Sequence, residues 1–269
     1  MNILLLYNHA PTIKSVCIIS LLCLVVSSIN AQSGKKEKTP KGTIYFALGS
    51  HRIFFTPSTI HVNRTANPQY NFTLEKVKGR DEGGLIFKTA PQFSYTLGYY
   101  FKNKNWGIEY QYDHIKYYVK QNQVVRMHGT IGNKEYNTDT LITPDFFKFE
   151  HTDGGNYAMI NVVKWIPLSS KEHKWYVPDL MIKGGFGLVN PKTGSTILGN
   201  YRDDRYHLSG YVVGFESGFR FTPVKHLFVT GTFKGVFANY NDILIAGGRA
   251  SQKWFSGQFN YMIGGQIPL

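Results

Sequence analysis

Cysteine is almost absent from this sequence: of 269 residues, only Cys17 and Cys23 are cysteines, and both lie in the N-terminal apolar segment. If that segment is removed from the mature chain, neither disulfides nor thiol chemistry remain. Neither cysteine follows a small residue, since Val16 and Leu22 precede them, so we do not expect lipid attachment at either one. These observations exclude disulfide-rich scaffolds and thiol-dependent enzymes.

Long apolar runs are also scarce. The one such run is Val16–Val26 (VCIISLLCLVV), and no later stretch approaches the roughly 18 apolar residues of a helical membrane span. Windows rich in Leu and Ala are nearly absent, whereas aromatic residues make up 15% of the chain and glycine occurs 27 times. This composition excludes helical spans from the mature chain and favours an all-β class.

The first 31 residues are typical of a secretory signal peptide. Lys14 is the sole Lys, Arg, Asp or Glu there, the apolar core is shorter than a span, and the small residue Ala31 precedes an expected cleavage before Gln32. An N-terminal anchor helix is the alternative. Residues 32–42 (QSGKKEKTPKG) follow as a polar, Lys-rich linker that we expect to be disordered. We therefore predict a signal peptide at 1–31, a linker at 32–42 and a folded domain at 43–269.

Two runs between Tyr206 and Tyr240 alternate between large apolar and small or polar residues. In the first run, Tyr211 and Phe215 share one parity, and Glu216 and Arg220 share the other. Successive side chains of a strand point to opposite faces, so each run has an apolar and a polar face. The short connection TPVKH joins the runs, and the pair predicts a β-hairpin.

The same alternation recurs along the domain and predicts eight strands in all. Besides the two strands of the hairpin, we expect strands at about Thr43–Phe55, Pro91–Lys102, Trp106–Val119, Asn156–Pro167, Trp175–Val189 and Trp254–Leu269. Their apolar faces would pack against a second sheet in a soluble sandwich, or against lipid in a membrane barrel.

The lengths of the connections decide between these two architectures. Short connections are expected at Asn103–Asn105, Leu168–Lys174 and Thr222–His226, and long ones at Thr56–Ala90, Lys120–Gly155, Asn190–Arg205 and Asn241–Lys253. Strict short/long alternation is typical of bacterial outer-membrane barrels, and a sandwich has no reason to sort its loops in this way. Aromatic residues at strand ends, namely Tyr99, Trp106, Trp165, Trp175 and Trp254, are expected to form girdles at the two membrane interfaces. The sequence thus predicts an all-β, eight-stranded antiparallel up-and-down transmembrane β-barrel.

With its signal segment, its alternating strands and its terminal strand, the chain resembles the small eight-stranded bacterial outer-membrane barrels of the OmpA, OmpW and OmpX types. The segments WGIEYQYDHIKYY (Trp106–Tyr118) and FEHTDGGNY (Phe149–Tyr157) are similar to segments of Bacteroidota outer-membrane barrels. The resemblance covers about residues 43–269 and is architectural. It implies a location in the outer membrane without implying an activity.

Polar residues of the inward faces are the first candidate site. An eight-stranded barrel is just wide enough for side chains to fill, so opposite charges inside are expected to pair as a structural plug. A narrow small-solute channel is the alternative. The predicted cluster comprises Glu109, Gln111, Asp113, Lys183, Glu216, Arg220 and Lys234, together with Asn161, Gln258 and Asn260.

His207 and Ser209 are a second candidate, at the outer end of one strand. Their parity matches that of Tyr211, which predicts the lipid-facing side. The pair resembles that of the lipid A deacylases, eight-stranded barrels that hydrolyse an acyl ester with a Ser–His–acid set. Where that family has an Asn after the Ser, this chain has Gly210, and Glu216 has the wrong parity to orient His207. The chain is therefore more simply a structural or binding barrel, with an esterase as the alternative.

No metal site and no cofactor are expected. His151 and Asp153 could ligate a metal, but their HTDGG context is typical of a turn. The chain carries 30 Lys and Arg against 17 Asp and Glu. In a secreted barrel, we assign this excess to the outer-membrane lipid and the phosphates of lipopolysaccharide rather than to nucleic acid. Candidate contacts are Lys116, Lys120, Arg126, Arg202 and Arg205, and we expect the chain to act as a monomer.

Overall fold

The computed structural model describes residues 42–81, 92–102, 105–151, 153–168 and 177–269. The predicted signal peptide, the linker up to residue 41, and Trp175 lie outside the described residues. In the part of the chain that the structure describes, no helix is long and apolar enough to cross a membrane.

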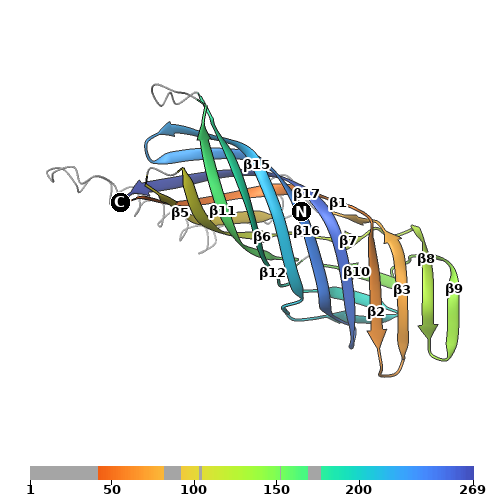
Figure 1. Cartoon of the computed structure of the whole chain (residues 1–269). Helices are drawn as coiled ribbons and strands as arrows, with labels where there is room; N and C mark the ends of the chain where they lie inside the picture. Colours follow the sequence, from red (N-terminus) through yellow and green to blue (C-terminus); the bar gives the residue numbers. More distant parts are fainter. Residues whose placement is uncertain (1–41, 82–91, 103–104, 152, 169–176) are drawn as a thin grey trace, which may run out of the picture. The chain divides into compact units, whose positions relative to one another are not determined.

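Eight antiparallel strands close into a barrel (Figure 1). The last strand returns to the first, and their pairing runs unbroken from Thr43↔Pro268 to Phe55↔Ser256. This arrangement confirms the all-β, eight-stranded up-and-down barrel expected from the alternation. In order around the barrel, the strands are β1 (Gly42–Phe55), β5 (Phe93–Phe101), β6 (Trp106–His114), β11 (Tyr157–Pro167), β12 (Asp179–Val189), β15 (Gly210–Val224), β16 (Leu227–Ile245) and β17 (Gly248–Pro268).

The outer surface of the barrel is apolar. Phe186, Phe215 and Ile263 are 71%, 60% and 63% exposed, whereas Lys183 and Glu216, with the opposite parity on their strands, are buried. Large apolar side chains in such a continuous band have no second sheet to cover them. They therefore face lipid, and the predicted outward parity of Phe215 is confirmed.

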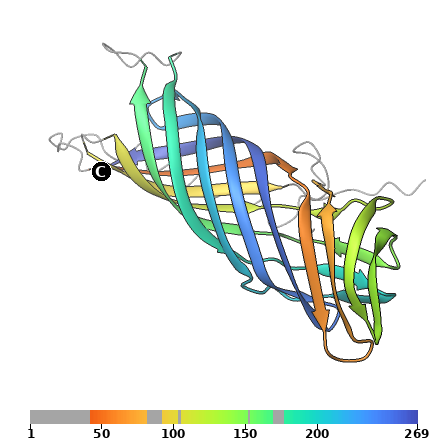
Figure 2. The same ribbon diagram turned by 45° about the vertical axis from the view of Figure 1, so that its right-hand side comes forward.

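Most of the connections expected as long loops are themselves strands, so that expectation was wrong. Four strands from two of these connections extend the barrel sheet beyond β17: β2 (Ser58–Arg64), β3 (Tyr70–Val77), β8 (Val124–Ile131) and β9 (Lys134–Leu141). Figure 2 shows these strands projecting past one end of the barrel. We call this the sheet end, and the opposite end, where β1 begins and β17 stops, the short-turn end. A second, smaller sheet contains β4 (Gly79–Arg80), β7 (Tyr118–Val119), β10 (Phe147–Glu150), β13 (Gly194–Ile197) and β14 (Asn200–Asp203).

These additional strands form because they bury apolar faces of their own. Ile60, Phe72 and Leu74 alternate with polar residues and belong to the same buried core as Phe147 and Phe149 of the second sheet. The ring centroids of Phe72 and Phe147 lie 6.4 Å apart. The sequence of these segments does alternate with a period of two, but they were interpreted as loops because they connect the predicted barrel strands.

The connection at Asn241–Lys253 was also expected to be long, and it is a tight turn. β16 continues to Ile245 and β17 begins at Gly248, which leaves Ala246 and Gly247 between them. The φ of +79° at Gly247 lies in the left-handed region that favours glycine, which permits the turn. The expected strand Trp106–Val119 is likewise shorter, because β6 ends at His114 and Tyr118–Val119 joins the second sheet.

The prediction of aromatic girdles at the strand ends is only partly confirmed. Trp106 is exposed on the outer face, with the ammonium of Lys164 4.6 Å from its ring centroid. Trp254 is buried, however, and Trp165 packs among buried residues inside the barrel. Trp254 shares its parity with Gln258 on β17, so its position near the end of the expected strand was misleading.

The apolar outer band generates a first prediction. Replacing Phe215 with Arg places a charge in lipid without a partner, and we expect the free energy of unfolding to fall by about 2–4 kcal/mol. Urea titration of the barrel refolded in lipid vesicles measures the effect. Phe215→Leu is the matched control and should lose much less; equal stability of Phe215→Arg and wild type would reverse the assignment of the faces.

Candidate functional site

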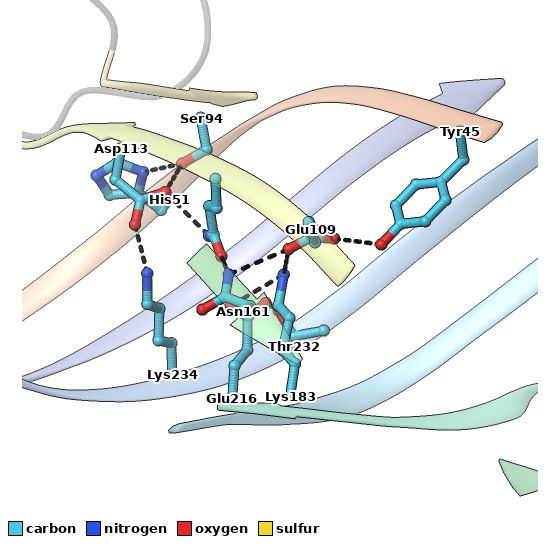
Figure 3. Close-up of polar contacts among 11 residues, drawn as sticks. Tyr45, His51, Ser94, Glu109, Asp113, Asn161, Lys183, Glu216, Thr232 and Lys234 are labelled. Atoms are coloured by element: carbon cyan, nitrogen blue, oxygen red, sulfur yellow. Dashed lines mark hydrogen bonds and ion pairs between the residues drawn. The ribbon is translucent and has the colours of Figure 1, made fainter. Parts of the chain in front are cut away.

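The interior of the barrel is built around two buried lysines. Lys183 on β12 places its Nζ 2.8 Å from Glu109 Oε1 and 3.3 Å from Glu216 Oε2 (Figure 3). All three side chains are at most 3% exposed. Lys183 and Glu216 are direct register partners on neighbouring strands, so the ordinary ladder positions this pair. The amide of Asn161 also donates to Glu109 Oε1, at 3.3 Å.

The second lysine crosses the lumen. Lys234 Nζ lies 2.6 Å from Asp113 Oδ2, and β16 and β6 stand on opposite sides of the eight-stranded ring. Asp113 also accepts from Ser94 Oγ at 2.7 Å and from Gln111 Nε2 at 3.0 Å. A buried carboxylate needs this many donors, because it loses its hydration when it is enclosed.

A glycine provides the room for this crossing. A Cβ built on Gly214 would lie 3.2 Å from Lys234 Cε and 3.1 Å from Met159 Cε. Both neighbours are side chains that fill the lumen, so the absence of a side chain at this inward position lets the lysine extend toward Asp113.

Arg220 is buried on the inward face of β15, as predicted, but it does not join the ion pairs of Lys183 and Lys234. Its guanidinium carbon lies 3.8 Å from the ring centroid of Trp165 and 3.7 Å from that of Phe228, and it donates to Gln266. These rings belong to a buried cluster with Tyr45 and Tyr100 near the short-turn end. Arg220 was expected to help balance the charges of Glu109 and Glu216, and the contacts found for its guanidinium are cation–π contacts and a hydrogen bond.

A second aromatic cluster fills the lumen toward the sheet end. Trp254 Nε1 donates to Tyr157 Oη at 3.1 Å, and its ring stacks on Tyr117 with centroids 4.7 Å apart. Tyr240 packs against Trp254 and donates from its hydroxyl to the carbonyl of Gly155 at 2.6 Å. The ion-pair cluster of Glu109, Asp113, Lys183, Glu216 and Lys234 therefore lies between two aromatic clusters.

His51 is one of several buried polar residues that the sequence did not predict, and it is 1% exposed. Its Nδ1 lies 2.9 Å from Ser94 Oγ, which links the imidazole through Ser94 to Asp113. The parity of Tyr45 and Ala47, which point inward on the same strand, was the signal that could have located it.

His207 and Ser209 do not form a nucleophile–base pair. Ser209 is fully buried, not lipid-facing as predicted, and its Oγ donates to the carbonyl oxygens of His207 and Asp242. The imidazole of His207 lies instead 2.8 Å from Asp242 Oδ2, and Arg249 contacts both residues. The parity argument failed here because β15 begins only at Gly210, after both residues.

His151 and Asp153 turn to different partners. Asp153 pairs with Lys192, and His151 Nδ1 lies 3.0 Å from Thr193 Oγ1. Burial lowers the pKa of His151 to about 3, so its ring is neutral at pH 7 and stacks on Tyr240 with centroids 5.4 Å apart. His151 thus extends the aromatic cluster at the sheet end.

Only some of the basic residues that were expected to contact lipopolysaccharide phosphates are exposed and without an ion-pair partner among the described residues. Lys116 is buried, Arg126 pairs with Asp139, and Arg202 pairs with Asp204. Lys120 and Arg205 are exposed.

A closed barrel that satisfies its backbone internally, with an apolar outside and a polar inside, defines a membrane-spanning β-barrel of the bacterial outer-membrane type. No protein-family model and no curated protein matches the chain. Among solved structures, it is similar to Ail, the attachment invasion locus protein of Yersinia pestis, crystallised with the heparin analogue sucrose octasulfate (11% identity, 82% of this chain and 99% of that chain, TM-score 0.32). It is also similar to Neisserial surface protein A (9% identity, 85% and 99%, TM-score 0.34) and to OprG of Pseudomonas aeruginosa (11% identity, 86% and 98%, TM-score 0.37). These likenesses concern the fold.

The ion pair across the lumen generates a second prediction. Lys234→Met keeps the length of the side chain but leaves the Asp113 carboxylate buried without its cation, which should cost about 3–5 kcal/mol of unfolding free energy. Lys225→Met, at an exposed lysine in the β15–β16 turn, is the matched control and should change little. Urea midpoints in vesicles measure both; equal losses in the two variants would show that the pair does not stabilise the barrel.

Proposed function

We propose that this chain is a binding barrel of the outer membrane, with a closed lumen and with its working surface on the folded sheets at the sheet end. It would act as a monomer, since one chain closes the barrel. The observation that carries the proposal is the Lys234–Asp113 pair across the middle of the lumen. A barrel whose interior is spanned by buried side chains has its remaining surface for function outside.

Closure has two further supports. The aromatic cluster around Trp165 and Arg220 lies toward one end of the lumen, and the cluster around Trp254 and Tyr240 lies toward the other. An eight-stranded barrel leaves little more than the volume of such side chains. These features favour a plug over the small-solute channel.

Planar-bilayer recording tests the closed lumen. We expect no steady conductance from the wild-type protein, with light scattering giving the mass of one chain and heat-modifiable gel mobility showing that it is folded. A large, ion-selective and reproducible conductance from the folded monomer would contradict the plug and favour the channel.

The esterase alternative has less support. A nucleophilic serine needs a base within hydrogen-bond reach, and the hydroxyl of Ser209 is engaged with two backbone carbonyls. The Nε2 of His207 does have a carboxylate partner in Asp242, but within the described ranges no serine hydroxyl is hydrogen-bonded to its Nδ1.

For the partner, we propose the phosphates of outer-leaflet lipopolysaccharide. Phe255 is an exposed apolar residue of β17. The exposed Lys253 lies two residues before it in the sequence and nearer to the sheet end. This lysine stands where the lipid-facing band gives way to polar residues, since its register partners are Asn239 and Thr59. An ammonium near an anionic membrane surface contributes roughly 1 kcal/mol of attraction.

The two ends of the barrel supply a matched comparison. We expect added lipopolysaccharide to raise the unfolding temperature of the wild type in detergent, and Lys253→Glu to reduce this rise. Lys225→Glu makes the same charge change at the opposite end and should retain the full rise. Equal responses of the two variants would contradict a contact at the sheet end.

A further inference from the structure

The outward face of the second sheet carries two rows of polar and aromatic side chains. β10, β13 and β14 are hydrogen-bonded neighbours, so residues in register lie side by side on the same face. Phe147 of β10 packs on Phe72 of β3, and this contact identifies the inward face of the sheet. Because β3 extends the barrel sheet beyond β17, the opposite face lies outside the lipid-facing band. Its two rows are Lys148–Thr196–Tyr201 and Glu150–Gly194–Asp203.

Gly194 forms a floor between two carboxylates. It is the register partner of Glu150 on one side and of Asp203 on the other. The nearest atoms to a Cβ built at Gly194 all belong to Glu150, with Oε1 at 3.2 Å and Cγ at 3.3 Å. The φ of Gly194 lies outside the left-handed region, so the backbone itself does not require glycine here. What the glycine provides is room above the strand, between the two acids.

The charges around this floor alternate in sign. Lys148 Nζ lies 3.0 Å from Glu150 Oε1, and Lys192 Nζ lies 2.9 Å from Asp203 Oδ2. Each partly exposed carboxylate has further lone pairs, because it offers about four acceptor positions. A free ion of either sign would meet a like charge at this site. A neutral ligand that carries several hydroxyl groups can instead donate to the carboxylates and accept from the ammonium groups.

Tyr201 supplies an open aromatic ring beside the floor. It is 67% exposed, and its register partner Thr196 lies two residues from Gly194 on the same face of β13. The other tyrosine of this face, Tyr118, is covered, since the guanidinium carbon of Arg80 lies 4.2 Å from its ring centroid. The face of an aromatic ring is negative and attracts the positive edge of a C–H group. A pyranose ring combines such a C–H face with hydroxyl groups at its rim.

We propose that this face binds a pyranose unit of a neutral polysaccharide, which stacks on Tyr201 and donates hydroxyl hydrogens to Glu150 and Asp203. The site rests on the proposed role of the sheet end as the binding surface, and it gives that surface a ligand class. The polysaccharide comes from the medium rather than from the membrane of the same cell. The second sheet packs on strands beyond the barrel, away from the lipid boundary at Lys253.

Saturation-transfer NMR of the full chain tests the site. The protein is held in deuterated phosphocholine micelles, since a glycoside detergent would compete. The probes are the methyl pyranosides of glucose, galactose, mannose and N-acetylglucosamine, with methyl glucuronoside as an anionic probe. We expect transfer to the ring C–H protons of at least one neutral probe. No transfer to any neutral probe, or stronger transfer to the glucuronoside, overturns the proposal.

Two variants of the tyrosine separate stacking from hydrogen bonding. Tyr201→Ala should weaken binding about tenfold, because it removes the ring on which the sugar stacks. Tyr201→Phe should retain binding, because the face of the ring makes the contact. Tyr211→Ala, at an exposed tyrosine of the lipid-facing wall, is the matched control and should bind like the wild type. Equal binding by Tyr201→Ala and wild type, or an equal loss in Tyr211→Ala, overturns the site.

Filling the floor gives an independent readout. Gly194→Ile keeps every charged and aromatic side chain of the face, and a β-branched residue suits a strand. We expect this variant to lose binding while its heat-modifiable gel mobility shows a folded barrel. Binding equal to that of the wild type overturns the role of the floor. If Gly194→Ile does not fold, the comparison of Tyr201→Ala with Tyr201→Phe still decides.

The response to lipopolysaccharide distinguishes this site from the contact at Lys253. If the wild type binds none of the neutral sugars but keeps a lipopolysaccharide stabilisation that depends on Lys253, the sugar site alone fails. Loss of sugar binding in Tyr201→Ala with an unchanged lipopolysaccharide response supports two separate surfaces. Displacement of the bound sugar by added lipopolysaccharide overturns the assignment of the polysaccharide to the medium.

Discussion

Within lipid, every backbone N–H and C=O must find its partner inside the protein, and in this chain the pairing of β1 with β17 meets that requirement. Closing the ring after eight strands makes the lumen narrow. Inward side chains from opposite strands therefore meet, as Lys234 and Asp113 do, and each inward polar group must be paired or hydrated. The ion pairs and the two aromatic clusters in the lumen follow from this one closure.

The polar interior lowers the stability of the barrel by desolvating charges, and it also defines the register of the strands. Two buried lysines and three carboxylates lose their hydration, which ion pairing only partly offsets. In return, the charges define the register of the barrel. A slip of one residue on β16 would direct Lys234 into lipid and Phe233 into the lumen, because side chains alternate along a strand. An apolar lumen would discriminate far less between the two faces.

Continuity of the long strands links the membrane part to the folded sheets outside it. β17 pairs with β1 through the barrel and then with β2 beyond it, and β16 continues alongside to Ile245. The aromatic cluster around Trp254 belongs to the same buried core as Phe72 and Phe147. Because one core serves the barrel mouth and the outer sheets, the outer surface is presented on rigid elements rather than on loops.

Local alternation in the sequence was sufficient for much of this fold. The period of two identifies the eight strands and assigns the outward Phe215 and the inward Glu216 to their faces, because parity is a property of neighbouring residues alone. The interior position of Glu109, Asp113 and Lys183 followed from the same rule. The alternation did not reveal that the 58–77 and 124–141 segments contain strands that extend the sheet beyond the barrel, since the same pattern fits a strand facing lipid and a strand facing a second sheet.

Partners across the barrel were decided only by the tertiary structure. That Lys234 meets Asp113, that Arg220 stacks on Trp165, and that Ser209 turns to backbone carbonyls all depend on strand stagger and on where each strand begins. The spacing of residues in the sequence does not determine the stagger of the strands or the residue at which each strand begins. The faces of the strands are therefore determined by the sequence alone, whereas the contacts inside the lumen exist only because closure brings distant strands within the reach of one side chain.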